Sequence, residues 1–442
     1  MLIRIYTAVL TPDQYSTPEL LYNTLNILYP IVSFSMADAI LRFGADKSYD
    51  IRKVYSSANI LLFAGMTVFA MTLPLWNMIS LYKNYTMLLF VYCLFSSFRQ
   101  LAAQCTRAAG KVKLFAADGI IAVFTQFICN MIFMVHFDMG INGYILSFIC
   151  SDAFSVIFLY TAGRLNKLNK FRFADRSIVK EMLRYSLPLI PTYLLWWITS
   201  SSDRLFVIKM EGSEANGIYA AAYKLPTLLM FLTTMFYQAW QLSSVEEKDS
   251  SDLSNFYSNV YDVYSSLIFT AAAFLILLAK PITSILLSGE IYSDAEKYTV
   301  ILILSMVFQC FCQFLSSIYS VKKKSVKSCI TALAAAVCNI VLNFILIPLL
   351  GVYGAAIATA VSYFICFVIR AADTRKYIYF KINTVRVTVN SVLLVIMAAV
   401  SVNQPGHFIL ILTGIVIVIV SVNIQNFMNF ILQLPVIQKI KA

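Results

Sequence analysis

The stretch SSSDRLFVIKM, residues 200–210, places Asp203 beside Arg204 in a segment that is otherwise apolar enough to lie in a lipid bilayer. A charge at the centre of a membrane helix costs about 2.5 to 3.5 kcal/mol even on insertion-based scales. Adjacent helical residues point about 100° apart, so the two charges do not face each other, and each needs a partner or a wet cavity of its own. The stretch therefore predicts a membrane helix with a polar function.

The composition of the whole chain agrees with a membrane location. Of the 442 residues, 60% are hydrophobic and 13% are charged, and the mean hydropathy is +0.76. In soluble domains, about a quarter of all residues are charged. Apolar runs recur from end to end, and no polar stretch is long enough to fold as a soluble domain. The sequence predicts an all-α polytopic membrane protein.

Apolar runs of about 20 residues, bounded by charges, Gly, Pro or Asn, predict thirteen membrane-spanning helices. The segment Met1–Leu10 reaches only about 15 Å as a helix, half of the hydrocarbon thickness. We therefore expect a first helix that is truncated or whose start is misassigned. The predicted spans are 20–42, 55–81, 85–106, 114–137, 140–163, 184–210, 215–243, 257–280, 297–321, 327–350, 352–371, 386–403 and 407–432.

The basic residues predict the orientation of the chain. Most of the 34 Lys and Arg residues fall near one set of alternate loops. The positive-inside rule assigns that set to the cytosol, together with the carboxyl terminus, and makes nucleic acid an unnecessary explanation for the net charge of +12. Anionic lipids are natural secondary partners of such loops. The opposite loops hold only Lys83, Lys209, Lys280 and Lys297, and the cytosolic set includes Arg42, Arg99, Arg107, Arg370, Arg375, Lys381 and Arg386.

No pattern of catalysis or of metal binding is visible. The nine cysteines lie in apolar runs or beside basic turns without metal-ligand spacing. The phosphate-binding loop Gly-x-x-x-x-Gly-Lys-Ser/Thr is missing, as are His-Glu-x-x-His and Gly-x-Ser-x-Gly. We expect no enzyme activity, no cofactor and no metal site.

Three pieces of sequence resemble a known family. They are YTAVLTPDQYS at 6–16, ADAILRF at 37–43, and DRLFV with GSEANGIYAAAYKL between 203 and 225. With this spacing the chain resembles, over nearly its full length, the polysaccharide (O-antigen or capsule) repeat-unit flippases of the multidrug/oligosaccharidyl-lipid/polysaccharide (MOP) exporter superfamily. Ser16 departs from the family pattern, where Gly is usual, and most of the first helix is missing.

The resemblance implies a MATE-like fold of fourteen helices, with the first one truncated here. Two pseudo-repeated bundles of six helices would surround a central cavity, followed by two extra carboxyl-terminal helices. The expected divisions are an amino-terminal bundle at 1–163, a basic cytosolic linker at 164–183, a carboxyl-terminal bundle at 184–371 and the two extra helices at 372–442.

The resemblance also implies a function. Undecaprenyl-diphosphate-linked oligosaccharide repeat units would be flipped across the bacterial inner membrane by alternating access, for a lipopolysaccharide or another polysaccharide. A polysaccharide polymerase and a chain-length regulator are the implied partners. A cation-coupled drug exporter of the same superfamily and a lipid-II flippase are alternatives. A membrane polymerase or glycosyltransferase is the rival from another class, but it would favour a large exterior loop, and the exterior loops here are short.

Charged and aromatic residues of two neighbouring spans are the candidates for substrate binding. Arg204 and Lys224 suit a diphosphate, because a guanidinium or ammonium group binds phosphate oxygens strongly in a low-dielectric cavity. Asp203 lies at a depth that predicts an ion pair with Lys224, and the alternative for all three is a structural contact between helices. Trp197, which follows Trp196 in mid-helix, suits stacking on a sugar ring or packing in the core.

Other acids allow two interpretations each. Asp152, near the middle of its span, suits coupling to protons or sodium, or an interhelical contact. Asp38 and Arg42 are one turn apart near the cytosolic end, which predicts an i,i+4 pair or phosphate capture by Arg42. Asp118 and Asp262 are expected to be solvated groups near helix ends.

Overall fold

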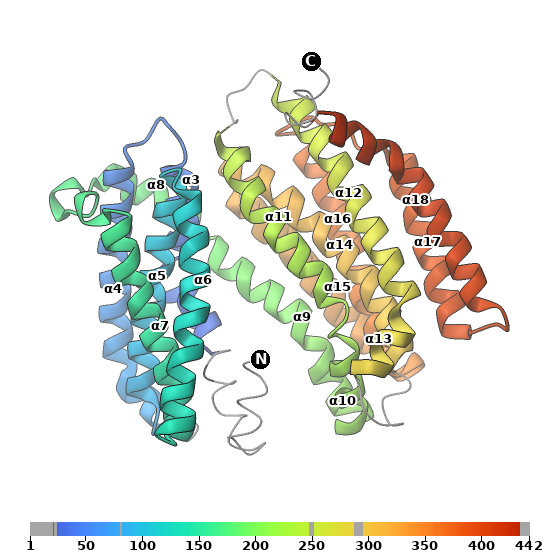
Figure 1. Ribbon diagram of the computed structural model, residues 1–442, viewed down its shortest axis with the longest axis horizontal. Helices are drawn as coiled ribbons and strands as arrows, with labels where there is room; N and C mark the ends of the chain where they lie inside the picture. The colour runs from blue at the N-terminus through green and yellow to red at the C-terminus, as the bar shows by residue number, and fades with distance from the viewer. Residues whose placement is uncertain (1–20, 22–23, 80–81, 247–251, 287–294, 434–442) are drawn as a thin grey trace. The chain divides into compact units, whose positions relative to one another are not determined.

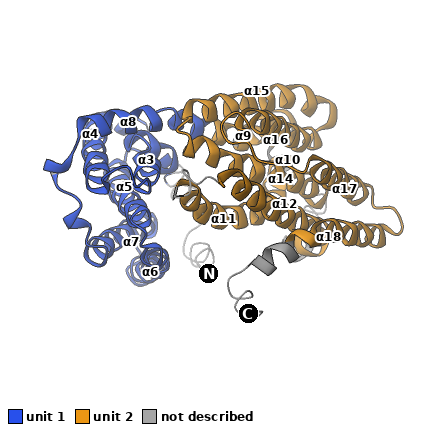
Figure 2. Cartoon of the chain, turned by 90° about the horizontal axis from the view of Figure 1, so that it is seen from above, with its two compact units in different colours: residues 1–194 blue, residues 195–442 orange. Residues whose placement is uncertain are grey.

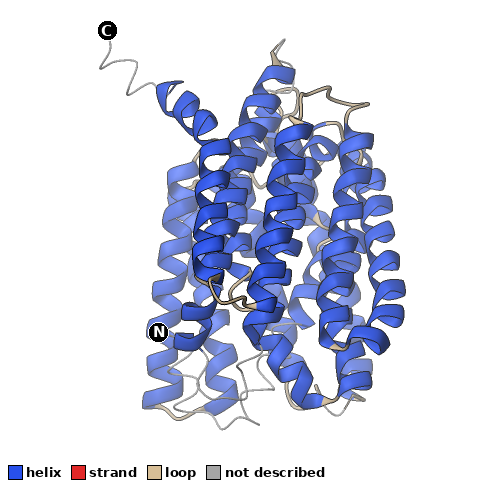
Figure 3. Ribbon diagram, turned by 90° about the vertical axis from the view of Figure 1, so that its right-hand side faces the viewer, coloured by secondary structure: helices blue, strands red, loops and turns tan. Residues whose placement is uncertain are grey.

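The computed structural model describes residues 21, 24–79, 82–246, 252–286 and 295–433, and in this part of the chain the regular structure is helical, without strands (Figures 1 and 3). Short 3-10 turns at Leu165–Lys167 and Phe171–Phe173 and a π-helical turn at Met131–His136 interrupt the α-helices. The α-helices are α3 (Met36–Gly44), α4 (Ile51–Asn77), α5 (Thr86–Ala108), α6 (Val112–Asn130), α7 (Gly140–Ala162), α8 (Arg176–Ser186), α9 (Leu189–Glu211), α10 (Ser213–Ala222), α11 (Thr227–Glu246), α12 (Leu253–Leu277), α13 (Ala279–Leu286), α14 (Ala295–Val321), α15 (Ser325–Leu350), α16 (Val352–Thr374), α17 (Thr384–Asn403) and α18 (Phe408–Gln433).

The chain divides into two compact units, coloured in Figure 2. Unit 1 comprises residues 1–194 and unit 2 comprises residues 195–442, so the boundary falls within α9. Each unit has its own core.

Unit 1 is built on α3 to α8. Its first span is bent by 55° between Thr24–Val32 and Met36–Gly44. A Cβ atom on Gly65 would lie 1.9 Å from the carbonyl oxygen of Val32, so only glycine allows α4 to approach the bend this closely. Asp50 and Asp175 cap the amino termini of α4 and α8 by accepting hydrogen bonds from backbone N–H groups.

Unit 2 is organised around α14, which packs against α10, α11, α12, α16 and α17. Aromatic rings from three helices fill the core around it; the ring of Phe314 stacks on those of Trp240 and Tyr264. Gly351 turns the chain between α15 and α16 with φ at 59°, in the left-handed region that favours glycine. At Gly354 a Cβ atom would lie 2.3 Å from the carbonyl oxygen of Leu346, which explains how α15 and α16 pack so closely there.

Each of the thirteen predicted spans overlaps at least one described helix, and the prediction of an all-α polytopic membrane protein is confirmed. Within the described ranges, ten helices are long and apolar enough to cross a membrane, or eleven if the bent first pair is one span. The predicted spans 184–210 and 215–243 fall on α9 and on α10 with α11, which are outside that set. Helix α9 carries several charges, and turns at residues 223–226 separate α10 from α11.

We counted several arginines with the cytosolic loops, although the predicted spans 85–106, 352–371 and 386–403 contain them, and the structure agrees with the spans. Arg99 lies well inside α5, and Arg370 and Arg386 lie in α16 and α17. Arg107, in the last turn of α5, is only 3% exposed, and Arg370 is fully buried. The guanidinium groups of Arg99, Arg370 and Arg386 find polar partners on other helices that the local sequence does not reveal.

Candidate functional site

A buried carboxylate on α9 is the centre of the most polar cluster in unit 2. The side chain of Asp203 is completely buried and accepts hydrogen bonds from Asn339 Nδ2 at 3.0 Å and from Asn343 Nδ2 at 2.8 Å, both on α15. It also accepts from the hydroxyl of Tyr219 on α10 at 3.0 Å and from that of Thr359 on α16. We call Asp203 and these four partners the Asp203 socket.

The spacing of the partners explains how the socket forms. Asn339 and Asn343 are four residues apart, so both amides project from one face of α15. Ser202, the neighbour of Asp203, donates to Asn339 Oδ1 at 2.6 Å and fixes the orientation of that amide. Asn343 Oδ1 is buried and has no hydrogen-bond partner.

The carboxyl group of Asp203 is therefore held by hydrogen bonds from neutral groups, without a cation among these partners. A buried carboxylate without a cation is costly, and a proton or a small cation would remove that cost. Carboxylate, amide and hydroxyl oxygens are the ligands that hard cations prefer, and the unpartnered Asn343 Oδ1 adds one such oxygen. The predicted ion pair between Asp203 and Lys224 is wrong: neutral donors surround the carboxylate, and the Lys224 side chain is exposed.

Arg204 lies on a different face of α9, about 100° around the helix from Asp203. Its side chain is exposed, and its Cζ atom lies 5.4 Å from the centre of the Tyr223 ring. Trp197, two turns earlier on the same face, is 47% exposed. Lys224 follows Tyr223 in the turn between α10 and α11, and its side chain is exposed. Arg204 and Lys224 make no ion pair with any residue that the structure describes, which leaves both available to an anion.

Trp196 points to a second buried charge, which the sequence analysis missed. Its ring lies 5.0 Å from Cζ of Arg370, whose guanidinium is fully buried in unit 2. The guanidinium donates to Thr331 Oγ1 at 2.9 Å and to the carbonyl oxygen of Cys312 at 2.8 Å. Ser316 and Ser328 accept further hydrogen bonds. In the sequence, the only indication of this buried arginine was the series of hydroxyl residues on α14 and α15 that accept its hydrogen bonds.

In unit 1, Asp152 lies in an ionic cluster rather than alone. Arg99 Nη1 lies 2.9 Å from Asp152 Oδ1, and Arg99 Nη2 lies 3.5 Å from Asp118 Oδ2. Asp118 is 2% exposed, so the expectation of a solvated end group is wrong for this residue. One guanidinium thus serves two carboxyl groups from α6 and α7.

The predicted i,i+4 pair of Asp38 with Arg42 is also wrong. Arg42 Nη1 binds Asp46 Oδ2 at 3.0 Å, because the chain turns back after α3 and brings Asp46 to it. Both side chains of this pair are buried. Asp38 instead accepts a hydrogen bond from Tyr193 Oη at 2.7 Å, which links α3 to α9. A phosphate would have to displace Asp46 to reach Arg42.

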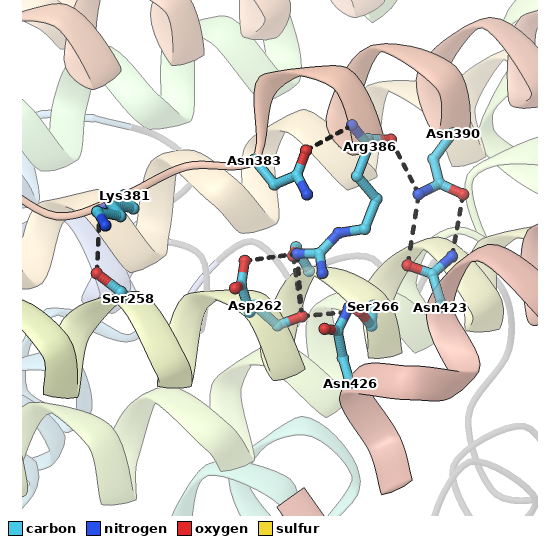
Figure 4. Close-up of polar contacts among 10 residues, drawn as sticks. Ser258, Asp262, Ser266, Lys381, Asn383, Arg386, Asn390, Asn423 and Asn426 are labelled. Atoms are coloured by element: carbon cyan, nitrogen blue, oxygen red, sulfur yellow. Dashed lines mark hydrogen bonds and ion pairs between the residues drawn. The ribbon is translucent and has the colours of Figure 1, made fainter. Parts of the chain in front are cut away.

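Polar contacts attach α17 and α18 to α12 (Figure 4). Arg386 Nη2 on α17 lies 2.6 Å from Asp262 Oδ1 on α12, so Asp262 is an ion-pair partner and the expectation of a merely solvated group is wrong. Asn390 and Asn423 exchange two hydrogen bonds between α17 and α18, at 3.4 and 3.0 Å. We call these two pairs the polar clamp. Asn426 on α18 adds a bond to Ser266 on α12.

At the loop end of unit 1, an ion pair and a hydrogen bond join the start of α4 to α8. Lys53 Nζ lies 2.9 Å from Asp175 Oδ2, and this contact lowers the pKa of the Asp175 carboxyl below its usual value. Tyr49 donates a hydrogen bond to Glu181 at 2.7 Å. Partial burial, and then the nearby Glu181 carboxylate, raise the pKa of the Tyr49 phenol to about 12, so the phenol stays protonated at neutral pH.

Apolar helices of spanning length, polar sockets between them and the division into two units define a multi-pass membrane protein with the fold of the MATE transporters. An outward-facing multidrug resistance MATE transporter of the MOP superfamily is similar, with a TM-score of 0.71, 18% identity, and coverage of 84% of this chain and 90% of that one. A mutant of the Vibrio cholerae MATE transporter VcmN gives a TM-score of 0.74 with 13% identity, over 84% of this chain and 90% of that one. A MOP superfamily transporter from Pyrococcus furiosus gives 0.71 with 18% identity over the same shares.

The sequence places the chain within one family of this superfamily. Residues 7–297 match the family model described as polysaccharide biosynthesis protein, and the chain belongs to that family. No curated protein sequence matches the chain. The recognition of a polysaccharide flippase family within the MOP superfamily is thereby confirmed. The roles of Arg204, Lys224, Asp203, Trp197, Arg42 and Asp152 stay predictions.

Proposed function

We propose that the protein flips undecaprenyl-diphosphate-linked oligosaccharide repeat units across the bacterial inner membrane by alternating access. Membership of the polysaccharide biosynthesis family supports a sugar-containing substrate. The observation that carries the proposal is the pair of exposed cations in the apolar part of the chain, Arg204 on α9 and Lys224 in the turn between α10 and α11. An ionised group there is expensive unless it binds an anion. The diphosphate of a lipid-linked sugar is such an anion.

The geometry of α9 suggests how binding and coupling are linked. Arg204 and Trp197 on the exposed face would contact the diphosphate and a sugar ring. Asp203, on the buried face of the same helix, would take up a proton or a small cation in the Asp203 socket. Binding of a proton or a small cation in the Asp203 socket would change the charge where α9, α10, α15 and α16 meet. A shift of α9 would then carry Arg204 with it. Asp152 is a weaker coupling candidate, because Arg99 already balances its charge.

The orientation and the partners complete the proposal. The distribution of basic residues supports a cytosolic carboxyl terminus. The flipped repeat units would be handed to a polysaccharide polymerase with its chain-length regulator at the outer face.

The test replaces Arg204 in a strain that lacks the native gene, with each variant produced at the wild-type level. Arg204→Ala should lower surface polysaccharide roughly tenfold or more, because a charge-assisted bond to phosphate is lost. Arg204→Lys keeps the charge without the planar fork and should give an intermediate amount. Lys209→Ala, at the end of the same helix, is the matched control and should have no effect.

The same strains separate the alternatives. Unchanged polymer in Arg204→Ala at full protein level would remove Arg204 from the mechanism. Cell lysis on deletion of the gene, without a specific loss of surface polymer, would favour a lipid-II flippase. Intact polymer together with altered drug sensitivity would favour a drug exporter. Lipid-linked repeat units that reach the outer face but remain unpolymerised would favour a polymerase.

A further inference from the structure

An apolar groove separates α16 from α17 in unit 2. Its volume is about 690 Å³, and α14 closes its back through Leu304 and Phe308. The walls are formed by side chains such as Phe364, Val368 and Val392, which are 45%, 48% and 51% exposed. The groove therefore opens at the surface of unit 2 that membrane-spanning helices present to their surroundings.

The length of the groove matches one leaflet of a bilayer. Along α17 it runs from Thr384 to Ile396, a rise of about 18 Å in an α-helix. One leaflet, counted with its headgroup region, is about 20 to 22 Å thick. The groove thus begins at a helix terminus and ends near the middle of the membrane, where an acyl chain would also end.

The mouth of the groove is positively charged. Arg375, directly after α16, lines the mouth, is exposed, and makes no ion pair with any residue that the structure describes. The neighbouring Lys376 already pairs with Asp373 at 3.3 Å. Deeper in the groove, the hydroxyl of Ser391 is buried and has no hydrogen-bond partner in the protein. A ligand with an anionic head, a hydrogen-bond acceptor below it and a hydrocarbon tail would satisfy all three features.

We propose that this groove binds an anionic phospholipid of the cytosolic leaflet, with its phosphate on Arg375 and one acyl chain between α16 and α17. The leaflet follows from the position of Arg375 in the basic loop set, and the inference is independent of the transported substrate. Basic pockets between membrane helices on the cytosolic side suit anionic headgroups. The polar clamp already holds α17 against α12 and α18, so the lipid would supply the missing packing on the side of α16 (Figure 4).

The test uses the purified full-length protein in phosphatidylcholine nanodiscs. A phosphatidylglycerol probe and a phosphatidylcholine probe, both with a photoreactive acyl chain, are crosslinked, and the labelled peptides are identified by mass spectrometry. The phosphatidylglycerol probe should label α16 and α17 about fivefold more than the phosphatidylcholine probe, as expected for one surface arginine. Arg375→Gln should reduce that preference to about one. Lys381→Gln, in the same loop but outside the groove, should keep it.

A second variant tests the acyl-chain site without touching the charge. Val392→Trp, at an exposed wall position, should reduce labelling by both probes while the protein stays folded. Equal labelling by the two probes, or a preference that survives Arg375→Gln, would overturn the proposal. Undecaprenyl phosphate at the same mole fraction as unlabelled phosphatidylglycerol should compete no better than that lipid. Selective displacement by undecaprenyl phosphate would assign the groove to a polyprenyl chain and overturn it as well.

Discussion

Replacing Asp203 separates the structural role of the Asp203 socket from its coupling role. Asp203→Ala removes the acceptor of four hydrogen bonds that come from α10, α15 and α16. Asp203→Asn keeps the shape and one carbonyl oxygen, and it removes the charge. The hydroxyls of Tyr219 and Thr359 can rotate and accept from the new amide, so the network can close again.

The magnitude follows from the number of bonds. Side-chain hydrogen bonds between membrane helices contribute about 0.6 kcal/mol each on average. Four such bonds predict that Asp203→Ala lowers the free energy of unfolding by roughly 2 to 3 kcal/mol. For Asp203→Asn the change should stay below about 1 kcal/mol, because the bonds are retained and a buried charge is removed. The same variant should nevertheless abolish polysaccharide export, since it can no longer gain or lose a charge.

Both quantities can be measured on the same variants. Unfolding in mixed micelles with increasing sodium dodecyl sulfate reports stability, and surface polysaccharide in the complemented deletion strain reports export. Ser200→Ala, also on α9 but bonded only to its own helix, is the control and should change neither. An Asp203→Ala protein as stable as the wild type would refute the socket as a determinant of folding. Normal export by Asp203→Asn would refute coupling through this carboxylate.

Three further predictions follow from contacts in the two units. Arg99→Gln leaves two carboxylates facing each other and should cost about 3 to 5 kcal/mol of unfolding free energy in micelles; wild-type stability would contradict the ionic cluster. Gly354→Ala should lower the yield of folded protein, whereas Gly119→Ala, with open space around its Cβ position, should not; equal yields would contradict the close packing of α15 on α16. The pKa of Asp175 is lowered by Lys53, so the carboxylate contributes to the α8 cap above its unfolded pKa of about 4 and loses that contribution as the pH falls through its lower folded pKa. Hydrogen exchange in the first turn of α8 should therefore accelerate on acidification in the wild type, relative to the intrinsic rate, but not in Asp175→Asn, which keeps a capping oxygen; identical pH profiles would contradict this.

The sequence predicts the helices well, because each span is encoded locally. An apolar run of about 20 residues has few alternatives to a membrane helix, since its backbone polar groups must be satisfied within the segment. The breaks were harder to predict. The bend after Val32 depends on the close contact with Gly65, which is distant in sequence.

The polar partners could not be predicted from spacing along one helix. The i,i+4 rule suggested Asp38 with Arg42, but Asp46 and Tyr193 come from a following turn and from another helix. The depths of Asp203 and Lys224 in the membrane suggested that they form an ion pair. A comparison of depths, however, does not show which face of α9 is buried. The actual partners include two neutral amides four residues apart on α15, and a search for opposite charges does not find them. Partner choice depends on helix rotation and packing, and these are tertiary properties.

The burial of Arg370 has a consequence for biogenesis. Helix α16 entering lipid alone would leave this guanidinium, about one turn before the last residue Thr374, without its acceptors, and the side chain would have to extend to the interface. Its acceptors, Ser316 on α14 and Ser328 and Thr331 on α15, precede it in the chain and are already synthesised when α16 emerges from the ribosome. We therefore expect α14, α15 and α16 to associate as they leave the translocon, and a ribosome-nascent chain that lacks α15 should integrate α16 less efficiently.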